Sequence, residues 1–67
     1  MPTQTFAMKL KALRIKRRLT QIELAKKLKV SQAFIAQLET GAEANPTLDT
    51  LRRLARVLQC RISELVE

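Results

Sequence analysis

Apolar residues recur along the chain at helical spacing, and capping residues divide them into short helices. The first predicted helix runs from about Phe6 to Arg18. Its stripe of inward positions is Phe6, Leu10, Leu13 and Arg17, and the basic residues largely off this stripe are Lys9, Lys11, Lys16 and Arg18. We expect an amphipathic helix that ends where the segment TQIE begins.

A second helix is predicted from Gln21 to about Leu28. Thr20 precedes Glu23 by three residues, which is the spacing of a capping box at a helix N-terminus. The inward positions of this helix are expected to be Ile22, Ala25 and Leu28. The two residues that follow, 29 and 30, leave room only for a tight turn.

A third helix is predicted from the capping residue Ser31 to about residue 39. Ile35 and Leu38 are its expected inward positions, and Gly41 ends it where a left-handed residue is favoured. Nine residues with a rise of about 1.5 Å each make a rod about 13 Å long. This length is close to the width of the DNA major groove, about 12 Å.

A fourth helix is predicted to follow a loop over residues 42–46. Thr47 is its expected cap, and Asp49 lies in its first turn, where the helix dipole favours an acid. Its expected buried face is Leu48, Leu51, Leu54, Ala55 and Leu58, and its expected exposed face is Arg52, Arg53 and Arg56. A last short helical turn is predicted over residues 62–66. The pattern therefore predicts one all-α domain of five helices over residues 1–67.

Composition narrows the classes of function. The 46% apolar content is mostly aliphatic, and Gly and Pro together number three, which favours helices. A chain without His, with a single cysteine (Cys60) and without a glycine-rich phosphate loop has no recognisable catalytic or metal-binding cluster. We therefore expect no enzyme activity, no metal and no cofactor. The absence of a long apolar run and of a signal-peptide pattern predicts a cytoplasmic protein.

Positive charge is concentrated in the first half of the chain. Residues 1–33 hold nine Lys or Arg and one acid, whereas residues 34–67 hold four Lys or Arg and five acids, which together give the net charge of +7. A strongly basic half indicates an anionic partner such as nucleic acid. The alternative is a solvated surface that keeps the protein in solution.

The stretch RRLTQIELAKKLKVSQAFIAQLETGAEANPTLDTLRRLARVL resembles the Cro/C1-type (XRE-like) helix-turn-helix family, which includes the lambdoid phage repressors. The residues that match the family pattern in type and order are Gln21, Leu24, Ala25, Val30, Ser31, Gln32, Ile35, Leu38, Glu39, Gly41, Pro46 and Leu51. The resemblance covers about residues 6–66 and implies a compact, lambda-repressor-like fold. Its helix-turn-helix spans about residues 21–39.

The resemblance, which assigns roles to Gln32, Gln37 and Gln21, and the chemistry of the remaining side chains together indicate which residues bind DNA. The expected base-contacting residues are Gln32, Ala33, Phe34 and Gln37, which with Ala36 form the outward face of the third helix. Gln can pair with the N6 and N7 atoms of adenine, and Ala or Phe can pack on a thymine methyl. The expected phosphate-contacting residues are Gln21, Ser31, Lys16, Arg17, Arg18 and Lys29. Gln21 is expected also to support Gln32, and Arg14 and Glu39 match a structural ion pair.

Some positions depart from the family pattern. Arg18, Lys29 and Gln59 stand where the family often has Gly, so a positive φ is expected at each. The loop Ala42-Glu43-Ala44 offers an acid where the family often has a base, and Arg61 stands in place of a Ser cap.

Two functions from different classes remain open on sequence alone. The first is a transcriptional regulator, expected to be a repressor, that binds a palindromic double-stranded DNA operator as a homodimer. Leu65 and Val66 are the apolar residues near the C-terminus that this homodimer could use. The second is an antitoxin-type module of a toxin–antitoxin pair, which binds a partner protein.

Overall fold

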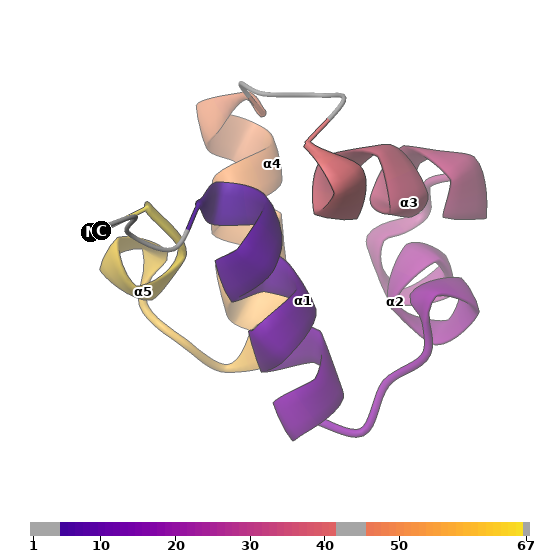
Figure 1. Ribbon diagram of the computed structural model, residues 1–67, viewed down its shortest axis with the longest axis horizontal. Helices are drawn as coiled ribbons and strands as arrows, with labels where there is room; N and C mark the ends of the chain where they lie inside the picture. The colour runs from indigo at the N-terminus through magenta and orange to yellow at the C-terminus, as the bar shows by residue number, and fades with distance from the viewer. Residues whose placement is uncertain (1–4, 42–45, 67) are drawn as a thin grey trace.

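The computed structural model describes residues 5–41 and 46–66, and these form five helices around one core (Figure 1). The helices are α1 (Phe6–Lys16), α2 (Gln21–Leu28), α3 (Gln32–Thr40), α4 (Leu48–Leu58) and α5 (Ile62–Val66). The all-α prediction with five helices is therefore confirmed. The loop Ala42-Glu43-Ala44 lies outside the described residues.

The polar residue before each of the first four helices caps it. The side-chain oxygens of Thr5, Thr20, Ser31 and Thr47 each accept a hydrogen bond from the backbone N–H three residues later. Glu23 completes the predicted capping box, because its Oε1 accepts from the backbone N–H of Thr20 at 2.8 Å. These caps set the starts of the helices close to the predicted positions.

Three helices end with a left-handed residue that is not glycine. Arg18, Lys29 and Gln59 have φ angles of 59°, 61° and 55°, so the predicted positive φ is confirmed at each. The residue after each one donates its backbone N–H to the carbonyl five residues earlier, over 2.9–3.1 Å. This arrangement satisfies carbonyls that a helix end would otherwise leave unpaired. The first helix thus ends at Lys16, two residues before the predicted Arg18.

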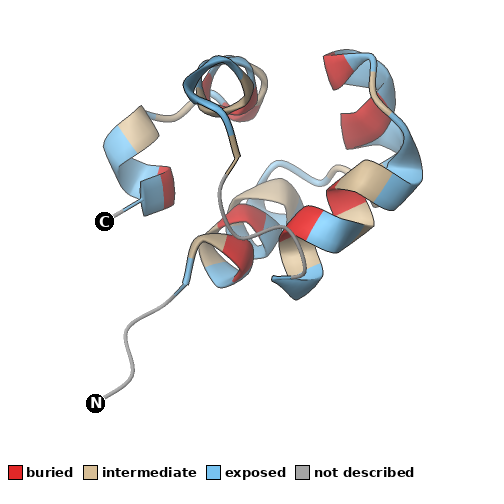
Figure 2. Ribbon diagram, turned by 90° about the horizontal axis from the view of Figure 1, so that it is seen from above, coloured by how far each residue is buried: buried red, intermediate tan, exposed pale blue. Residues whose placement is uncertain are grey.

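The core draws residues from all five helices, and buried positions lie on the sides of the helices that face one another (Figure 2). The side chains with no exposed surface are Leu10, Leu24, Ile35, Leu38, Leu54, Leu58 and Leu65. Leu65 belongs to this core, so its predicted availability to a second copy of the chain was wrong. Val66 next to it is 51% exposed.

The spacing of apolar residues wrongly predicted that two other side chains, those of Ile22 and Leu48, are buried. Ile22 was expected inside, but it is 53% exposed, because Leu24, Ala25 and Leu28 form the buried face of α2. Leu48 was expected inside and is 56% exposed. It is the first residue of α4, whose first turn stands at the edge of the molecule (Figure 1).

Cys60 is half-buried and packs against the core. Burial raises the pKa of its thiol, Glu64 raises this pKa further, and Arg17 opposes the shift. The thiol is therefore held in its protonated, weakly nucleophilic form at neutral pH.

No helix in the described ranges is both long and apolar enough to cross a bilayer.

Candidate nucleic-acid interface

The N-termini of α2 and α3 lie side by side. Gln21 is the first residue of α2 and Gln32 is the first residue of α3. The Nε2 of Gln32 donates a hydrogen bond to the Oε1 of Gln21 at 3.2 Å. Since one side-chain contact joins the two first residues, both helix starts face the same side of the molecule.

These helix starts leave backbone donors for a ligand. Ser31 Oγ accepts from the N–H of Phe34, and Thr20 Oγ1 accepts from the N–H of Glu23. The N–H groups of the first two residues of each helix have no intrahelical acceptor. Together with the positive end of each helix dipole, they form an arrangement suited to binding an anion such as phosphate.

A network of polar side chains lies directly behind Gln32. Gln21 Nε2 donates to Glu39 Oε1 at 3.1 Å, and Arg14 Nη2 donates to the same oxygen at 3.1 Å. Arg14 Nε lies 2.6 Å from Glu39 Oε2. The side chains of Arg14 and Glu39 are only 11% and 3% exposed, so this ion pair is largely dry.

Arg14 has one more partner that the sequence did not suggest. Its Nη1 donates to the backbone carbonyl of Leu19 at 2.7 Å. The guanidinium therefore joins α3, through Glu39, to the segment that connects α1 and α2. This position holds the start of α2 in place relative to α3.

A hollow of about 420 Å³ opens next to this network. Its lining comes from the end of α1, the start of α2 and the start of α3: Arg14, Ile15, Arg18, Leu19, Thr20, Gln21, Ile22 and Gln32. Four of the predicted site residues thus border one surface depression. The exposed apolar side chains of Ile15 and Ile22, which were not predicted as site residues, form part of its wall.

The outward face of α3 is smaller than predicted. Ala33 and Gln37 are exposed and, being four residues apart, share one face of the helix. Phe34 was expected to face outward, but it is half-buried and packs against the core. Ala36 is also half-buried. Packing against the core removes apolar surface of the large Phe34 ring from water, which explains why this side chain does not face fully outward.

The basic residues of the predicted phosphate-contacting set divide into two groups. Lys16, Arg18 and Lys29 are exposed, and no hydrogen bond or ion pair of their side chains occurs within residues 5–41 and 46–66. Arg17 instead donates its Nε to the carbonyl of Leu58 at 2.7 Å and its Nη2 to that of Gln59 at 3.0 Å. Arg17 therefore links α1 to the end of α4.

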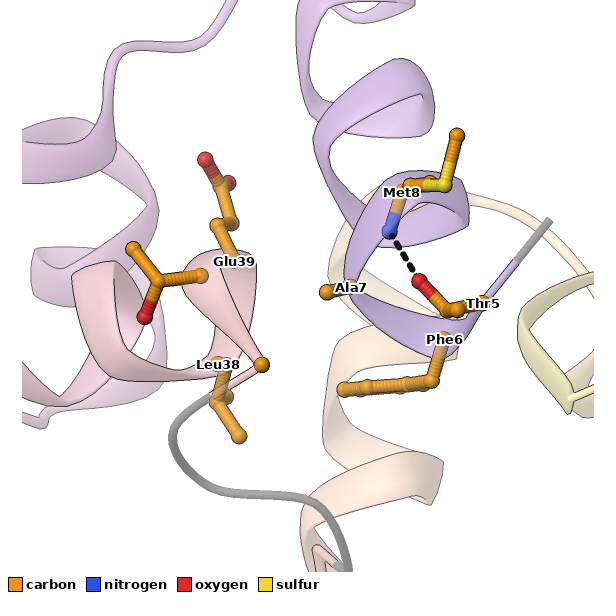
Figure 3. A pocket seen from close by; sticks show the side chains of 8 residues that line it. Thr5, Phe6, Ala7, Met8, Leu38 and Glu39 are labelled. Carbon is orange, nitrogen blue, oxygen red and sulfur yellow. Dashed lines mark hydrogen bonds between the residues drawn. The ribbon is translucent and has the colours of Figure 1, made fainter.

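A second hollow, of about 360 Å³, lies between the first turn of α1 and the last turn of α3 (Figure 3). Phe6, Ala7, Met8 and Leu38 make its lining largely apolar. Glu39 also borders it, but its carboxylate extends away from Phe6 and Leu38 and bonds to Arg14 and Gln21 (Figure 3). This hollow is separate from the surface formed by Gln21 and Gln32.

In the described part of the chain, no group of three His, Cys, Asp or Glu could hold a metal ion.

Comparison with known proteins agrees with this geometry. A family model described as Helix-turn-helix matches residues 10–65. The immunity repressor protein of Bacillus phage phi105 is 37% identical over 62 residues, which is 92% of this chain but only 42% of the repressor. The chain thus spans less than half the length of this relative.

Two solved structures give similar results. The restriction-modification controller protein C.AhdI from Aeromonas hydrophila is 28% identical with a TM-score of 0.83, covering 90% of this chain and 89% of its own. The hydroxypropylphosphonic acid epoxidase from S. wedmorenis is 32% identical with a TM-score of 0.87. This match covers 92% of the present chain and 32% of the epoxidase, so the same fold also occurs as one part of a larger enzyme chain.

Proposed function

The chain belongs to the Cro/C1-type helix-turn-helix family, and we propose that it is a sequence-specific regulator of transcription that binds double-stranded DNA and acts as a repressor. The observation that carries the proposal is the contact between Gln32 and Gln21. It brings two helix N-termini and two amide side chains onto one side of the molecule. Such a surface can bind phosphates and read bases at the same time.

In this proposal α3 enters the major groove. Its nine residues make a rod about 13 Å long, comparable with the groove. Gln32, Ala33 and Gln37 are its exposed residues that can reach base edges. Gln32 is suited to adenine, and the methyl group of Ala33 to a thymine methyl. Phe34 takes a smaller part, because it is half-buried and packs against the core.

The exposed cations hold the DNA backbone. Lys16, Arg18 and Lys29 have free side chains in the described part of the chain, and the N–H groups at the starts of α2 and α3 add uncharged donors. Gln21 and Ser31 lie at these two helix starts and can approach the same phosphates. Arg17 is left out of this set, because two of its donors are used by the end of α4.

The proposal includes a homodimer on a palindromic operator, in the bacterial or phage-infected cytoplasm. Two copies of α3 one helical turn apart require half-site centres about 34 Å, or 10–10.5 base pairs, from each other. The molecule measures 34 × 23 × 23 Å, so two copies lying side by side can meet this spacing.

Selection of bound duplexes from a random pool tests the proposal. The selection is run at about 50 mM and about 200 mM salt, because non-specific binding falls steeply over this range. We expect one enriched motif with two-fold symmetry at both salt concentrations. A pool that stays random would contradict a sequence-specific regulator and favour the protein-binding alternative.

A further inference from the structure

We propose that Glu39 is a positioning residue for sequence specificity, because its carboxylate fixes the direction in which the amides of Gln21 and Gln32 point. This inference rests on the proposed function and deepens it. It concerns how Gln32 is prepared to read one base, beyond the presence of a glutamine at that position.

The Glu39 side chain is almost completely buried at the centre of the network. Its Oε2 accepts from Arg14 Nε, and its Oε1 accepts from both Arg14 Nη2 and Gln21 Nε2. With 3% of its side chain exposed, water cannot replace these partners. One carboxylate oxygen therefore connects a buried ion pair to an amide at the start of α2.

The chemistry of the groups then dictates a direction. An ionised carboxylate only accepts hydrogen bonds, whereas an amide has a donor end and an acceptor end. Gln21 must therefore turn its NH₂ group toward Glu39, which leaves its Oε1 on the other side. Gln32 meets this oxygen and must turn its own NH₂ group toward it, in agreement with the 3.2 Å contact. A single charge at Glu39 thus orients both amides.

The orientation matters because adenine presents its edge in a fixed order. Its N6 group donates and its N7 atom accepts, so the reading amide must offer an acceptor and a donor in matching positions. Gln32 retains its Oε1 and its second Nε2 proton for this purpose. Gln32 is exposed, so without the network water would satisfy either orientation, and the amide could turn around and accept other base edges.

A purely structural ion pair would not require this arrangement. Arg14 alone already supplies a donor to each oxygen of Glu39. The additional contact from Gln21 is what connects the pair to the surface that faces the ligand. Removing the carboxylate should therefore affect base discrimination, whereas weakening its attraction to Arg14 should affect mainly stability.

The experiment uses the duplex enriched from the random pool by the unaltered protein. Discrimination is the ratio of dissociation constants for this duplex and for one changed at the base pair that the Gln32→Ala variant no longer distinguishes. The variants are Glu39→Gln, which removes the charge but keeps the shape, and Arg14→Lys, which keeps both charges but cannot make the two-pronged contact. Circular dichroism confirms folding at the measuring temperature.

We expect Glu39→Gln to lower discrimination at that base pair about tenfold, within the range of one bidentate base contact, with non-specific affinity unchanged. Arg14→Lys should lower the melting temperature but keep discrimination within about twofold. In a protein that already carries Gln21→Met, Glu39→Gln should cause no additional loss, because the connecting amide is already missing. Unchanged discrimination in a variant that has no acceptor at position 39, or an equal loss in Glu39→Gln and Arg14→Lys, would overturn the inference.

Because Glu39→Gln keeps one oxygen that can accept from Gln21, the double variant Arg14→Met with Glu39→Met is measured beside it and replaces it if it does not fold, since it leaves neither an acceptor at this position nor a single buried charge. The same loss of discrimination is expected, and retained discrimination would overturn the inference. A failure of the proposed function is seen separately and earlier. The unaltered protein would then enrich no motif, which would overturn both proposals before any variant is made.

Discussion

The basic residues of this protein are not equivalent, although the sequence presents them as one group. Arg14, Arg17 and Arg53 each donate to a backbone carbonyl at or just after a helix end: those of Leu19, of Leu58 and Gln59, and of Leu28. Arg53 was expected only to face solvent. These three side chains connect helices, so fewer cationic side chains are free to contact phosphates than the thirteen Lys and Arg of the sequence suggest.

The Gln32→Ala variant tests direct base reading. Ile35 and Leu38 still anchor α3 and Ser31 still caps it, so the free energy of unfolding should change little. Discrimination should fall by about 1–3 kcal/mol at one base pair per half-site, while binding to unrelated DNA stays nearly the same. Competition binding with single-base-pair variants of the duplex measures this. An equal loss on all sequences would show that Gln32 contacts the backbone instead.

A double-mutant cycle on Arg14 and Glu39 tests the energy of the buried pair. Either single replacement, Arg14→Met or Glu39→Gln, leaves an unpaired charge in a nearly dry site and should cost about 3 kcal/mol. The double replacement should cost clearly less than the two together. Urea denaturation gives the three values. A coupling energy close to zero would place this pair with exposed ion pairs, which contribute about 0–1 kcal/mol.

At the scale of the elements, Arg17 is expected to stabilise the contact between α1 and the end of α4. Arg17→Ala removes two charge-assisted hydrogen bonds to carbonyls and should lower the free energy of unfolding by about 1–2 kcal/mol. The matched control is Lys16→Ala at the neighbouring last residue of α1, whose exposed side chain should contribute less than about 0.5 kcal/mol.

The salt dependence of DNA binding should change more in Lys16→Ala than in Arg17→Ala, which is the reverse of their effects on stability. Lys16→Ala, Arg18→Ala and Lys29→Ala should each flatten the slope of log K against log salt by about 0.9 for every phosphate that the variant no longer neutralises. Arg17→Ala should leave the slope almost unchanged. A larger change in slope for Arg17 than for Lys16 would show that Arg17 leaves α4 to bind DNA.

The capping box of α2 predicts a pH dependence. Hydrogen bonds from the backbone N–H and hydroxyl of Thr20 lower the pKa of Glu23 below its ordinary value of 4.5. The stabilisation from this capping box is therefore complete above pH 4.5 and disappears as the pH falls through the lowered pKa. Glu23→Gln should remove this part of the acid dependence in thermal melts. An identical pH profile for both proteins would contradict the role of the carboxylate.

The helix boundaries were predicted well from the sequence, because capping motifs involve only residues that are a few positions apart. Thr20 and Ser31 set the starts of α2 and α3 through hydrogen bonds from the backbone N–H three residues later, and Gly41 ends α3 in the left-handed conformation. The periodicity of apolar residues gives the direction of a side chain but does not say which neighbour covers it. Ile22 and Phe34 were misplaced for this reason.

The candidate site was predicted only in part for the same physical reason. The family pattern pointed to Gln21, Gln32, Arg14 and Glu39 as residues with a role, and the structure brings these four into one network. Arg17, by contrast, bonds to the carbonyls of Leu58 and Gln59, which lie 41 and 42 positions further along the chain. No short-range signal in the sequence encodes such a contact, because it depends on how the completed helices pack.

At the scale of the whole molecule, the helices divide into a supporting part and a presenting part. α1 contacts α3 and α5, and α4 contacts α2 and α5, so α1 and α4 hold α2 and α3 from behind. α2 and α3 also contact each other, with their N-termini on one side. The core makes this a rigid support, which allows a short helix to keep its outward residues in a defined orientation.

Changes in the amide NMR shifts on adding the enriched duplex test directly whether DNA binds at the starts of α2 and α3, because they locate the DNA-binding surface without any substitution. We expect the largest changes on residues 20–22 and 31–37, including the side-chain amides of Gln21 and Gln32. The amides of α5 should change little, apart from any at a contact between two copies. Largest changes on α5 or on the outer face of α4, with the amides of Gln21 and Gln32 unmoved, would show that DNA binds elsewhere than at the starts of α2 and α3.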